Sequence, residues 1–338
     1  MNIKRLGLDL AKHSFSLCVV DPHDHIVIEK TLKRKDLTRF MSTLTPCLIG
    51  MEAGSGAHHW ARVFTQLGHT PRIMAPKFIA PYRRNGKNDR NDARAICEAV
   101  GRPNMHFVPH KNTQQQAILS VHRIRTVHVD AQTRLANQLR GILAEFGIVI
   151  PKGINKLRHD WQTLRQQYQE QLPALAWQEL DTLYQQFIDL HQTLLSYDRK
   201  INAIVRDDIR CQQLMQLNGV GPITASAIVA TVGNAQAFKN GRQFAAWLGL
   251  TPRQYSTGGK TRLGRISKQG DTYLRKLLVH GARSELMYTA KRDDSKSRWA
   301  ERLKQNKSWN KAAVALANKQ ARLIWAVLTK GEAFIPVM

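Results

Sequence analysis

Short apolar runs and amphipathic stretches alternate along the first 110 residues of the chain. Apolar, β-rich runs bounded by Gly, Pro or Asp predict strands, and apolar positions spaced three and four apart predict helices. Strands are predicted at residues 3–11, 14–21, 26–32, 47–53 and 70–76, and helices at 35–44, 55–68 and 90–102. The resulting β-β-β-α-β-α-β-α order predicts a mixed α/β sheet covered by helices.

Two long helical patterns follow. Residues 113–147 and 173–207 repeat apolar side chains at helical spacing, as Leu135, Leu139 and Leu143 do. Residues 148–172, which contain Pro, Gly and Trp, are expected to join the two helices. The pattern predicts a helical hairpin or coiled-coil arm, most of whose side chains serve only as scaffold.

The last third of the chain mixes helical patterns with glycine-rich turns. The run LNGVGP (217–222) resembles a helix-hairpin-helix turn, in which helix N-termini present backbone N–H groups to a phosphate. The alternative is a tight turn that needs Gly for backbone freedom. Residues 251–270 are expected to be a glycine-rich loop, followed by a helix from about Asp271 and a last amphipathic helix at 309–329. Three domains are therefore expected, at residues 1–110, 111–212 and 213–338.

The charge is strongly positive and uneven. The 338 residues carry 51 Lys and Arg against 25 Asp and Glu, a net charge of +26. Such a balance favours a polyanionic partner, because neutralising phosphates releases counterions. The net charge is +8 over residues 1–110, +3 over 111–212 and +15 over 213–338. The last third is thus the expected main nucleic-acid surface, although a generally adhesive basic protein would share the composition.

Cysteine spacing and hydropathy exclude several classes. The four cysteines form no C-x-x-C pair, which argues against a zinc site or a disulfide framework. No run of 18 apolar residues exists, and the N-terminus lacks an apolar signal region. These features predict a soluble cytoplasmic protein that is not associated with a membrane.

Four carboxylates fall at the ends of predicted elements. Asp9 ends the first strand and Glu52 the fourth, while Asp89 and Asp92 stand one turn apart at a helix start. If the first and fourth strands are neighbours, the four side chains converge and repel one another unless cations lie between them. One or two Mg²⁺ ions, which take oxygen ligands, would suit such a cluster and could clamp a phosphate. Helix capping and pairing with nearby arginines are the alternatives for Asp89 and Asp92.

Three motifs around these carboxylates resemble a known family. GLDLAK (7–12), GMEAGSG (50–56) and KNDRNDARAI (87–96) resemble the acidic-tetrad (DEDD) transposases of insertion sequences, related to the Piv invertase and to the bridge-RNA-guided recombinases of the IS-one-ten and IS-eleven-eleven type. The string TPRQYSTGGKTRLGRISKQG (251–270) resembles the C-terminal transposase domain of the same family. The resemblance implies an α/β plus all-α protein: a RuvC-like mixed sheet of the RNase H superfamily, a coiled-coil arm and a mainly helical C-terminal domain.

The resemblance also implies a serine nucleophile. Ser256 matches the family position best, Thr257 is an alternative, and Ser267 is a weaker candidate. A serine can attack a phosphodiester and hold the DNA end covalently. Basic residues near the serine and near the acidic pair are expected to bind nucleic acid: Arg253, Lys260, Arg262, Arg265 and Lys268, and Lys87, Arg90 and Arg94.

The leading hypothesis is a transposase or recombinase in which Asp9, Glu52, Asp89 and Asp92 hold Mg²⁺ and Ser256 attacks DNA. The resemblance further implies double-stranded DNA partners at the element ends and the target, a guide RNA, and a dimer or tetramer. One alternative is a RuvC-like nuclease or Holliday-junction resolvase that hydrolyses DNA with no covalent step. Another is a basic RNA-binding protein without enzymatic activity.

Overall fold

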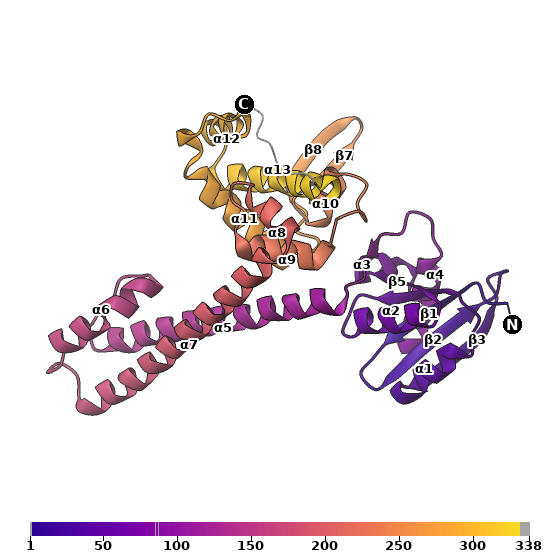
Figure 1. The fold of residues 1–338 in the computed structure, drawn as a ribbon, viewed down its shortest axis with the longest axis horizontal. Helices are drawn as coiled ribbons and strands as arrows, with labels where there is room; N and C mark the ends of the chain where they lie inside the picture. The colour runs from indigo at the N-terminus through magenta and orange to yellow at the C-terminus, as the bar shows by residue number, and fades with distance from the viewer. Residues whose placement is uncertain (1, 85, 87, 332–338) are drawn as a thin grey trace. The chain divides into compact units, whose positions relative to one another are not determined.

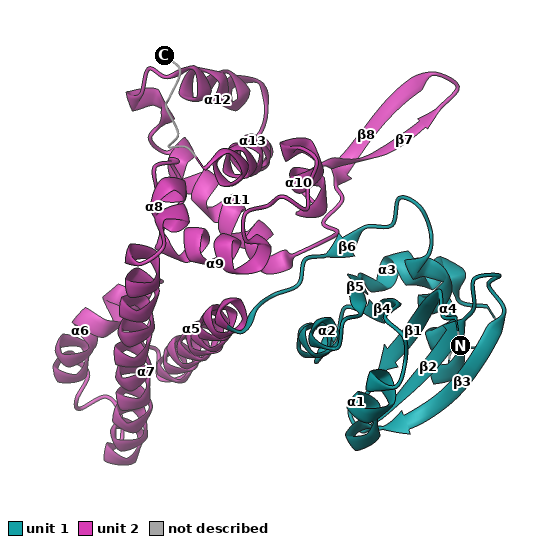
Figure 2. Ribbon diagram, turned by 45° about the vertical axis from the view of Figure 1, so that its right-hand side comes forward, with its two compact units in different colours: residues 1–113 teal, residues 114–338 magenta. Residues whose placement is uncertain are grey.

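Two compact units make up the chain (Figures 1 and 2). The computed structural model describes residues 2–84, 86 and 88–331, and its units are Met1–Thr113 and Gln114–Met338. The arm and the C-terminal helices fall in one unit, and this division into units does not test whether they are separate domains. The three domains expected from the sequence therefore stay a prediction. No helix in the described part of the chain is long and apolar enough to span a membrane.

Unit 1 is built on a six-stranded mixed sheet of order β3-β2-β1-β4-β5-β6. Strands β1, β4 and β5 run parallel, whereas β2, β3 and β6 join by antiparallel pairs. The first and fourth strands are neighbours, as predicted, because the β1–β2–β3 meander extends outward from β1. The strands are β1 (Arg5–Leu10), β2 (Ser14–Val20), β3 (Ile26–Lys33), β4 (Leu48–Glu52), β5 (Thr70–Met74) and the short β6 (Phe107–Val108), which the sequence pattern did not predict.

Four helices and a 3₁₀ turn accompany this sheet: α1 (Arg34–Ser42), α2 (Ala57–Gln66), α3 (Pro76–Ile79), η1 (Ala80–Tyr82) and α4 (Asp89–Val100). Helix α4 lies directly on β1 and β4 because two glycines face it. A Cβ at Gly50 would come within 2.8 Å of the Val100 side chain, and a Cβ at Gly7 would clash with the backbone of Ala93 and Cys97. The glycines therefore fix the distance between the sheet and α4.

Replacing Gly7 by Ala is expected to destabilise unit 1 by about 3 kcal/mol, because backbone atoms of α4 cannot move aside as a flexible side chain could. Thermal or urea unfolding of the full chain measures the change. Gly54→Ala is the matched control, since a Cβ there meets nothing within 4 Å. Equal stability of the two variants would contradict the packing role given to Gly7.

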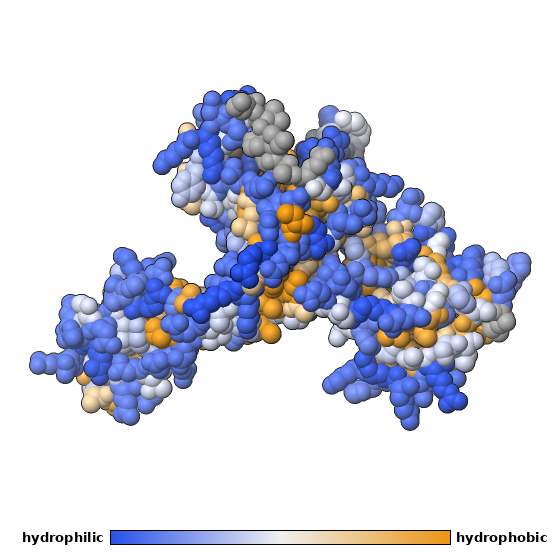
Figure 3. All heavy atoms as spheres, in the orientation of Figure 1, coloured by the Kyte–Doolittle hydropathy of each residue, from blue (hydrophilic) through white to orange (hydrophobic). Residues whose placement is uncertain are grey.

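Unit 2 begins with a helical arm made of α5 (Thr113–Glu145), α6 (Ile154–Gln167) and α7 (Ala174–Arg206). The two long helices confirm the predicted pattern. The joining segment contains α6, a helix for which the sequence analysis made no prediction; its Leu157 and Trp161 are buried, and Trp161 stacks on Tyr184 at 4.4 Å. On the face shown in Figure 3, hydrophilic residues cover most of this arm.

The rest of unit 2 packs helices around one apolar core. Its elements are α8 (Ile209–Met215), α9 (Pro222–Val232), α10 (Gly241–Trp247), β7 (Pro252–Thr257), β8 (Lys260–Ile266), α11 (Thr272–Leu286), η2 (Thr289–Lys291), α12 (Ser295–Asn306) and α13 (Trp309–Lys330). In the turn between α8 and α9, Gly219 has φ +81° and lies against Gly281 of α11. Tight packing thus explains this glycine, and phosphate binding by the turn stays a prediction.

A buried histidine ties the arm to this core. The Ser226 hydroxyl donates to the Pro222 carbonyl (2.7 Å), so it accepts from His122 Nε2 (3.1 Å), and His122 Nδ1 accepts from the Tyr273 hydroxyl (3.0 Å). Burial lowers the pKa of His122 to about 4, so the ring is neutral at physiological pH. The network joins α5, α9 and the start of α11.

Candidate active site

The carboxyl ends of β1 and β4 bring two carboxylates side by side. In the parallel register Gly7 pairs with Gly50 and Leu8 with Met51, so Asp9 and Glu52 come next on each strand. Side chains two residues apart share one face of a sheet. Because Gly7 and Gly50 face α4, Asp9 and Glu52 point to the α4 side as well. Both side chains are partly buried.

The first turn of α4 supplies the other two carboxylates. Asn88, not an aspartate, caps this helix, and its side chain accepts from Asn91 N at 2.8 Å. Capping therefore leaves both aspartates available. Asp89 is exposed, whereas Asp92 is only 8% exposed and forms an ion pair with Arg83.

The four carboxylates act on one another electrostatically. Burial, followed by the negative charges of Asp92, Asp89 and Glu52, raises the pKa of Asp9 to about 6. A negative charge raises the pKa of a carboxyl group when it lies near that group and is not neutralised by a positive charge. Asp92, Asp89 and Glu52 thus lie near enough to Asp9 to act on its charge, so the volume at this end of β1 and β4 is acidic.

The chemistry of this volume suits a hard divalent cation. Its donors are carboxylate oxygens, the ligands that Mg²⁺ prefers, and their mutual repulsion would be relieved by a cation. No three His, Cys, Asp or Glu side chains in the described residues stand in metal-binding geometry. The Arg83–Asp92 ion pair occupies one of the four, so binding a metal would require Asp92 to exchange Arg83 for the ion.

Two of the residues predicted to contact nucleic acid pair with a carboxylate in the structure, and their contact with nucleic acid stays a prediction. Arg90 and Arg94 both form ion pairs with Glu29 of β3, and Arg94 Nη2 donates to Glu29 Oε2 at 2.9 Å. Hydrogen bonds from Arg94 and Arg90 lower the pKa of Glu29 to about 2. Lys87, the third cation expected here, lies outside the described residues. Sequence spacing gave no signal for Glu29, which is 61 residues from Arg90.

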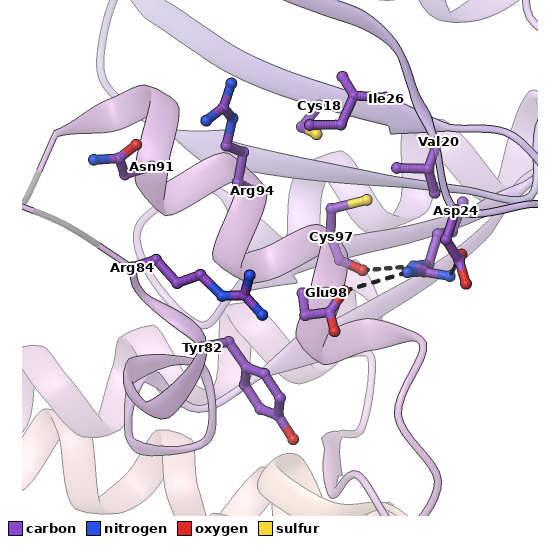
Figure 4. A pocket seen from close by; sticks show the side chains of 11 residues that line it. Cys18, Val20, Asp24, Ile26, Tyr82, Arg84, Asn91, Arg94, Cys97 and Glu98 are labelled. Atoms are coloured by element: carbon purple, nitrogen blue, oxygen red, sulfur yellow. Dashed lines mark hydrogen bonds and ion pairs between the residues drawn. The ribbon is translucent and has the colours of Figure 1, made fainter.

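A separate cavity of ≈ 280 Å³ lies between α4 and the outer strands (Figure 4). Arg84 and Arg94 line it, together with Cys18 and Cys97. Arg5 Nε donates to the Cys97 carbonyl at 2.8 Å in its wall. The cavity includes none of the four carboxylates, so it is distinct from the acidic cluster.

The predicted serine stands on a β-hairpin of unit 2. Residues 251–270 were expected to be a loop, but β7 and β8 pair antiparallel, and Ser256 is opposite Thr261. Gly258 (φ +56°) and Gly259 (φ +74°) form a two-residue turn, which requires left-handed backbone at both positions. The Ser256 hydroxyl is exposed and accepts from Gln254 Nε2 at 2.8 Å.

The hairpin sorts the predicted cations by face. Alternation along each strand puts Lys260 and Arg262 on the Thr257 face, opposite to Ser256, whereas a register shift near the base of the hairpin interrupts the alternation before Arg265. Arg253 Nη2 donates to the Ser267 carbonyl at 3.3 Å, at the base of the hairpin. Lys268, the remaining predicted contact, has φ +54° just beyond it. Both hydroxyl candidates therefore lie on an exposed, basic hairpin.

Two family models match the chain. A model described as "Transposase", of the DEDD type, matches residues 6–148, and a model described as "Transposase IS116/IS110/IS902 family" matches residues 211–299. The first match contains the four carboxylates and the second contains the serine hairpin.

Curated proteins similar over nearly the full length include three transposases. A "Probable family 20 transposase" of Pseudomonas aeruginosa is 47% identical over 99% of this chain and 100% of its own length. The transposase for insertion sequence element IS1328 of Yersinia enterocolitica is 37% identical over 98% of this chain and 99% of its own. The transposase for insertion sequence element IS1111A of Coxiella burnetii is 36% identical over 98% of this chain and 92% of its own.

Proposed function

This chain belongs to the IS116/IS110/IS902 family of transposases, and from that premise we propose that its acidic cluster and its serine hairpin together cut and rejoin DNA strands. DNA strand transfer is the activity of the family, whose DEDD domain depends on divalent metal. The assignment of that activity to particular residues is the proposal. The observation that carries it is the position of Asp9 and Glu52 at adjacent strand ends that face α4, the helix whose first turn holds Asp89 and Asp92, with all three neighbours raising the pKa of Asp9.

Asp9, Glu52, Asp89 and Asp92 would hold one or two Mg²⁺ ions. A bound ion would neutralise charge that develops on the phosphate oxygens during transfer. Asp92 would release Arg83 on metal binding. The freed guanidinium could then donate to a phosphate oxygen, since Arg matches phosphate geometry well.

Ser256 would be the nucleophile. Its Oγ attacks the phosphorus, the Oγ proton leaves to a base, and the bond from phosphorus to the departing strand oxygen breaks. The DNA end is then held as a phosphoserine ester, so no external energy source is needed for rejoining. Attack by another strand's hydroxyl restores the phosphodiester and frees the serine. Gln254 positions Ser256 Oγ through its hydrogen bond.

An RNA encoded by the element would choose the DNA sites, and the protein would act as a dimer or tetramer. The net charge of +26 supports a large polyanionic assembly. The experiment combines purified protein with element-end and target duplexes and Mg²⁺, with or without transcripts of the DNA that flanks the gene. Strand exchange should require one transcript. Exchange at full rate without any RNA would refute RNA guidance while leaving the transposase activity intact.

A further inference from the structure

A cavity of ≈ 700 Å³ lies between α10, α12 and α13 in unit 2, within the residues that the structure describes. The side chains that matter for its chemistry are Arg242, Trp299, Lys319, Arg322 and Trp325. No carboxylate belongs to the described lining of this cavity. It thus combines positive charge with aromatic surface and lacks the negative charge that would neutralise it internally.

Close packing of two helices builds its basic rim. A Cβ at Gly241 would lie 3.0 Å from Cα and from the carbonyl oxygen of Arg322, so the absence of a side chain at Gly241 lets α10 pack closely on α13. This contact brings Arg242, the next residue, and Arg322 to one rim. Both side chains are exposed, and neither has an ion-pair partner in the described part of the chain.

The cavity wall carries a third cation against an aromatic ring. Lys319 Nζ lies 4.5 Å from the centre of the Trp299 ring. Burial, followed by the positive charges of Lys296 and Arg322, lowers the pKa of Lys319, and Asp294 offsets this only in part. Lys296 has its own partner, Glu285, at 2.6 Å, whereas Lys319 makes no ion pair among the described residues. An anionic ligand would relieve this repulsion.

The second indole is anchored. Trp325 Nε1 donates to the Phe238 carbonyl at 3.1 Å, which fixes the ring orientation in the wall. Half-buried indoles beside lysine and arginine are the elements of single-strand recognition, because bases stack on the rings while phosphates meet the cations. Bases in an intact duplex stack on one another and would not present their faces to a recessed ring.

We propose that this cavity binds an unpaired segment of a DNA strand, with a base against Trp299 and the neighbouring phosphates on Arg242 and Arg322. DNA is the favoured source because strand transfer by this family must release strand ends from their duplex. The inference depends on neither the acidic cluster nor Ser256, so it can fail or hold independently of the proposed mechanism.

The test is fluorescence anisotropy of the full chain without metal, using labelled oligo-dT, an RNA oligonucleotide of the same length and a DNA duplex. The double substitution Arg242→Gln/Arg322→Gln should weaken oligo-dT binding about tenfold. It should also make the fall of log K with log salt less steep, by about 1.4 in the slope, because two phosphate contacts are lost. Trp299→Leu, which keeps an apolar side chain, should weaken it about tenfold as well. Arg302→Gln/Lys307→Gln, which removes two exposed cations of α12 and its cap outside the cavity, is the matched control.

Three results would overturn the inference. Equal weakening of oligo-dT binding by the cavity and control variants would show that general charge, and not the cavity, causes the effect. An equal loss of affinity for the duplex and for oligo-dT would show that no unpaired base is recognised. A loss confined to the RNA oligonucleotide would assign the cavity to RNA. If Trp299→Leu fails to fold, as circular dichroism would show, the exposed arginine pair still decides between these outcomes.

Discussion

Asp9→Asn is expected to lower DNA strand transfer by at least about a thousandfold while raising the melting temperature of the chain. A metal-held phosphate gains several kcal/mol of transition-state stabilisation, and about 1.4 kcal/mol corresponds to a factor of ten. The raised pKa of Asp9 means that folding disfavours its charged form, so a neutral side chain should relieve repulsion at neutral pH. A strand-transfer assay and thermal unfolding at pH 7.5 measure both effects.

Asp36→Asn is the matched control, because Asp36 is an exposed carboxylate of α1 in the same unit. It should leave strand transfer unchanged and should not raise the melting temperature. DNA affinity without metal should stay the same or rise in Asp9→Asn, since one negative charge is removed. Retained activity of Asp9→Asn would exclude it from the catalytic centre and favour a non-enzymatic role for the acidic cluster.

Ser256→Ala is expected to abolish the covalent protein–DNA adduct and to reduce strand exchange to background. The substitution removes only the hydroxyl group, and the side chain is exposed, so the stability of the fold should change little. The measurement incubates the protein with labelled element-end DNA and Mg²⁺, denatures the mixture, and looks for label that migrates with the protein.

Thr257→Ala separates the two hydroxyl candidates on the hairpin. Thr257 shares its face with Lys260 and Arg262, whereas Ser256 shares its face with Gln254 and Thr261. If Thr257→Ala loses the adduct and Ser256→Ala keeps it, the nucleophile is assigned wrongly. If wild-type protein cleaves DNA yet forms no adduct, the hydrolytic nuclease mechanism replaces the covalent one.

The places of the four carboxylates, at the ends of β1 and β4 and at the start of α4, could be predicted from sequence because local patterns encode these elements. GLD and GME each put a glycine two residues before a carboxylate at a strand end, and α4 begins at Asp89. A meander that places β4 beside β1 then brings the carboxylates together. The sequence pattern did not identify the packing role of Gly7 and Gly50, although the same spacing contains the signal.

The ion pairs of Arg90 and Arg94 could not be predicted, because Glu29 reaches these two arginines only through the position of β3, 61 and 65 residues earlier in the chain. Pairing of Asp92 with a nearby arginine was an alternative that the sequence offered, and Arg83 forms that ion pair. The hairpin could have been predicted, although residues 251–270 were expected to be a loop. Gly258-Gly259 between two stretches of strand-like residues is typical of a two-residue hairpin turn, but the many glycines of this segment favoured the interpretation as a loop.

Crystals of the full chain soaked in Mn²⁺ would show whether the four carboxylates bind a metal ion. Mn²⁺ takes the same oxygen ligands as Mg²⁺ and scatters anomalously. We expect an anomalous peak within coordination distance of carboxylate oxygens from at least three of Asp9, Glu52, Asp89 and Asp92, with Asp92 released from Arg83. Well-ordered carboxylates with no anomalous peak among them would contradict the metal site. An ion bound elsewhere, with the Arg83–Asp92 ion pair intact, would contradict it as well.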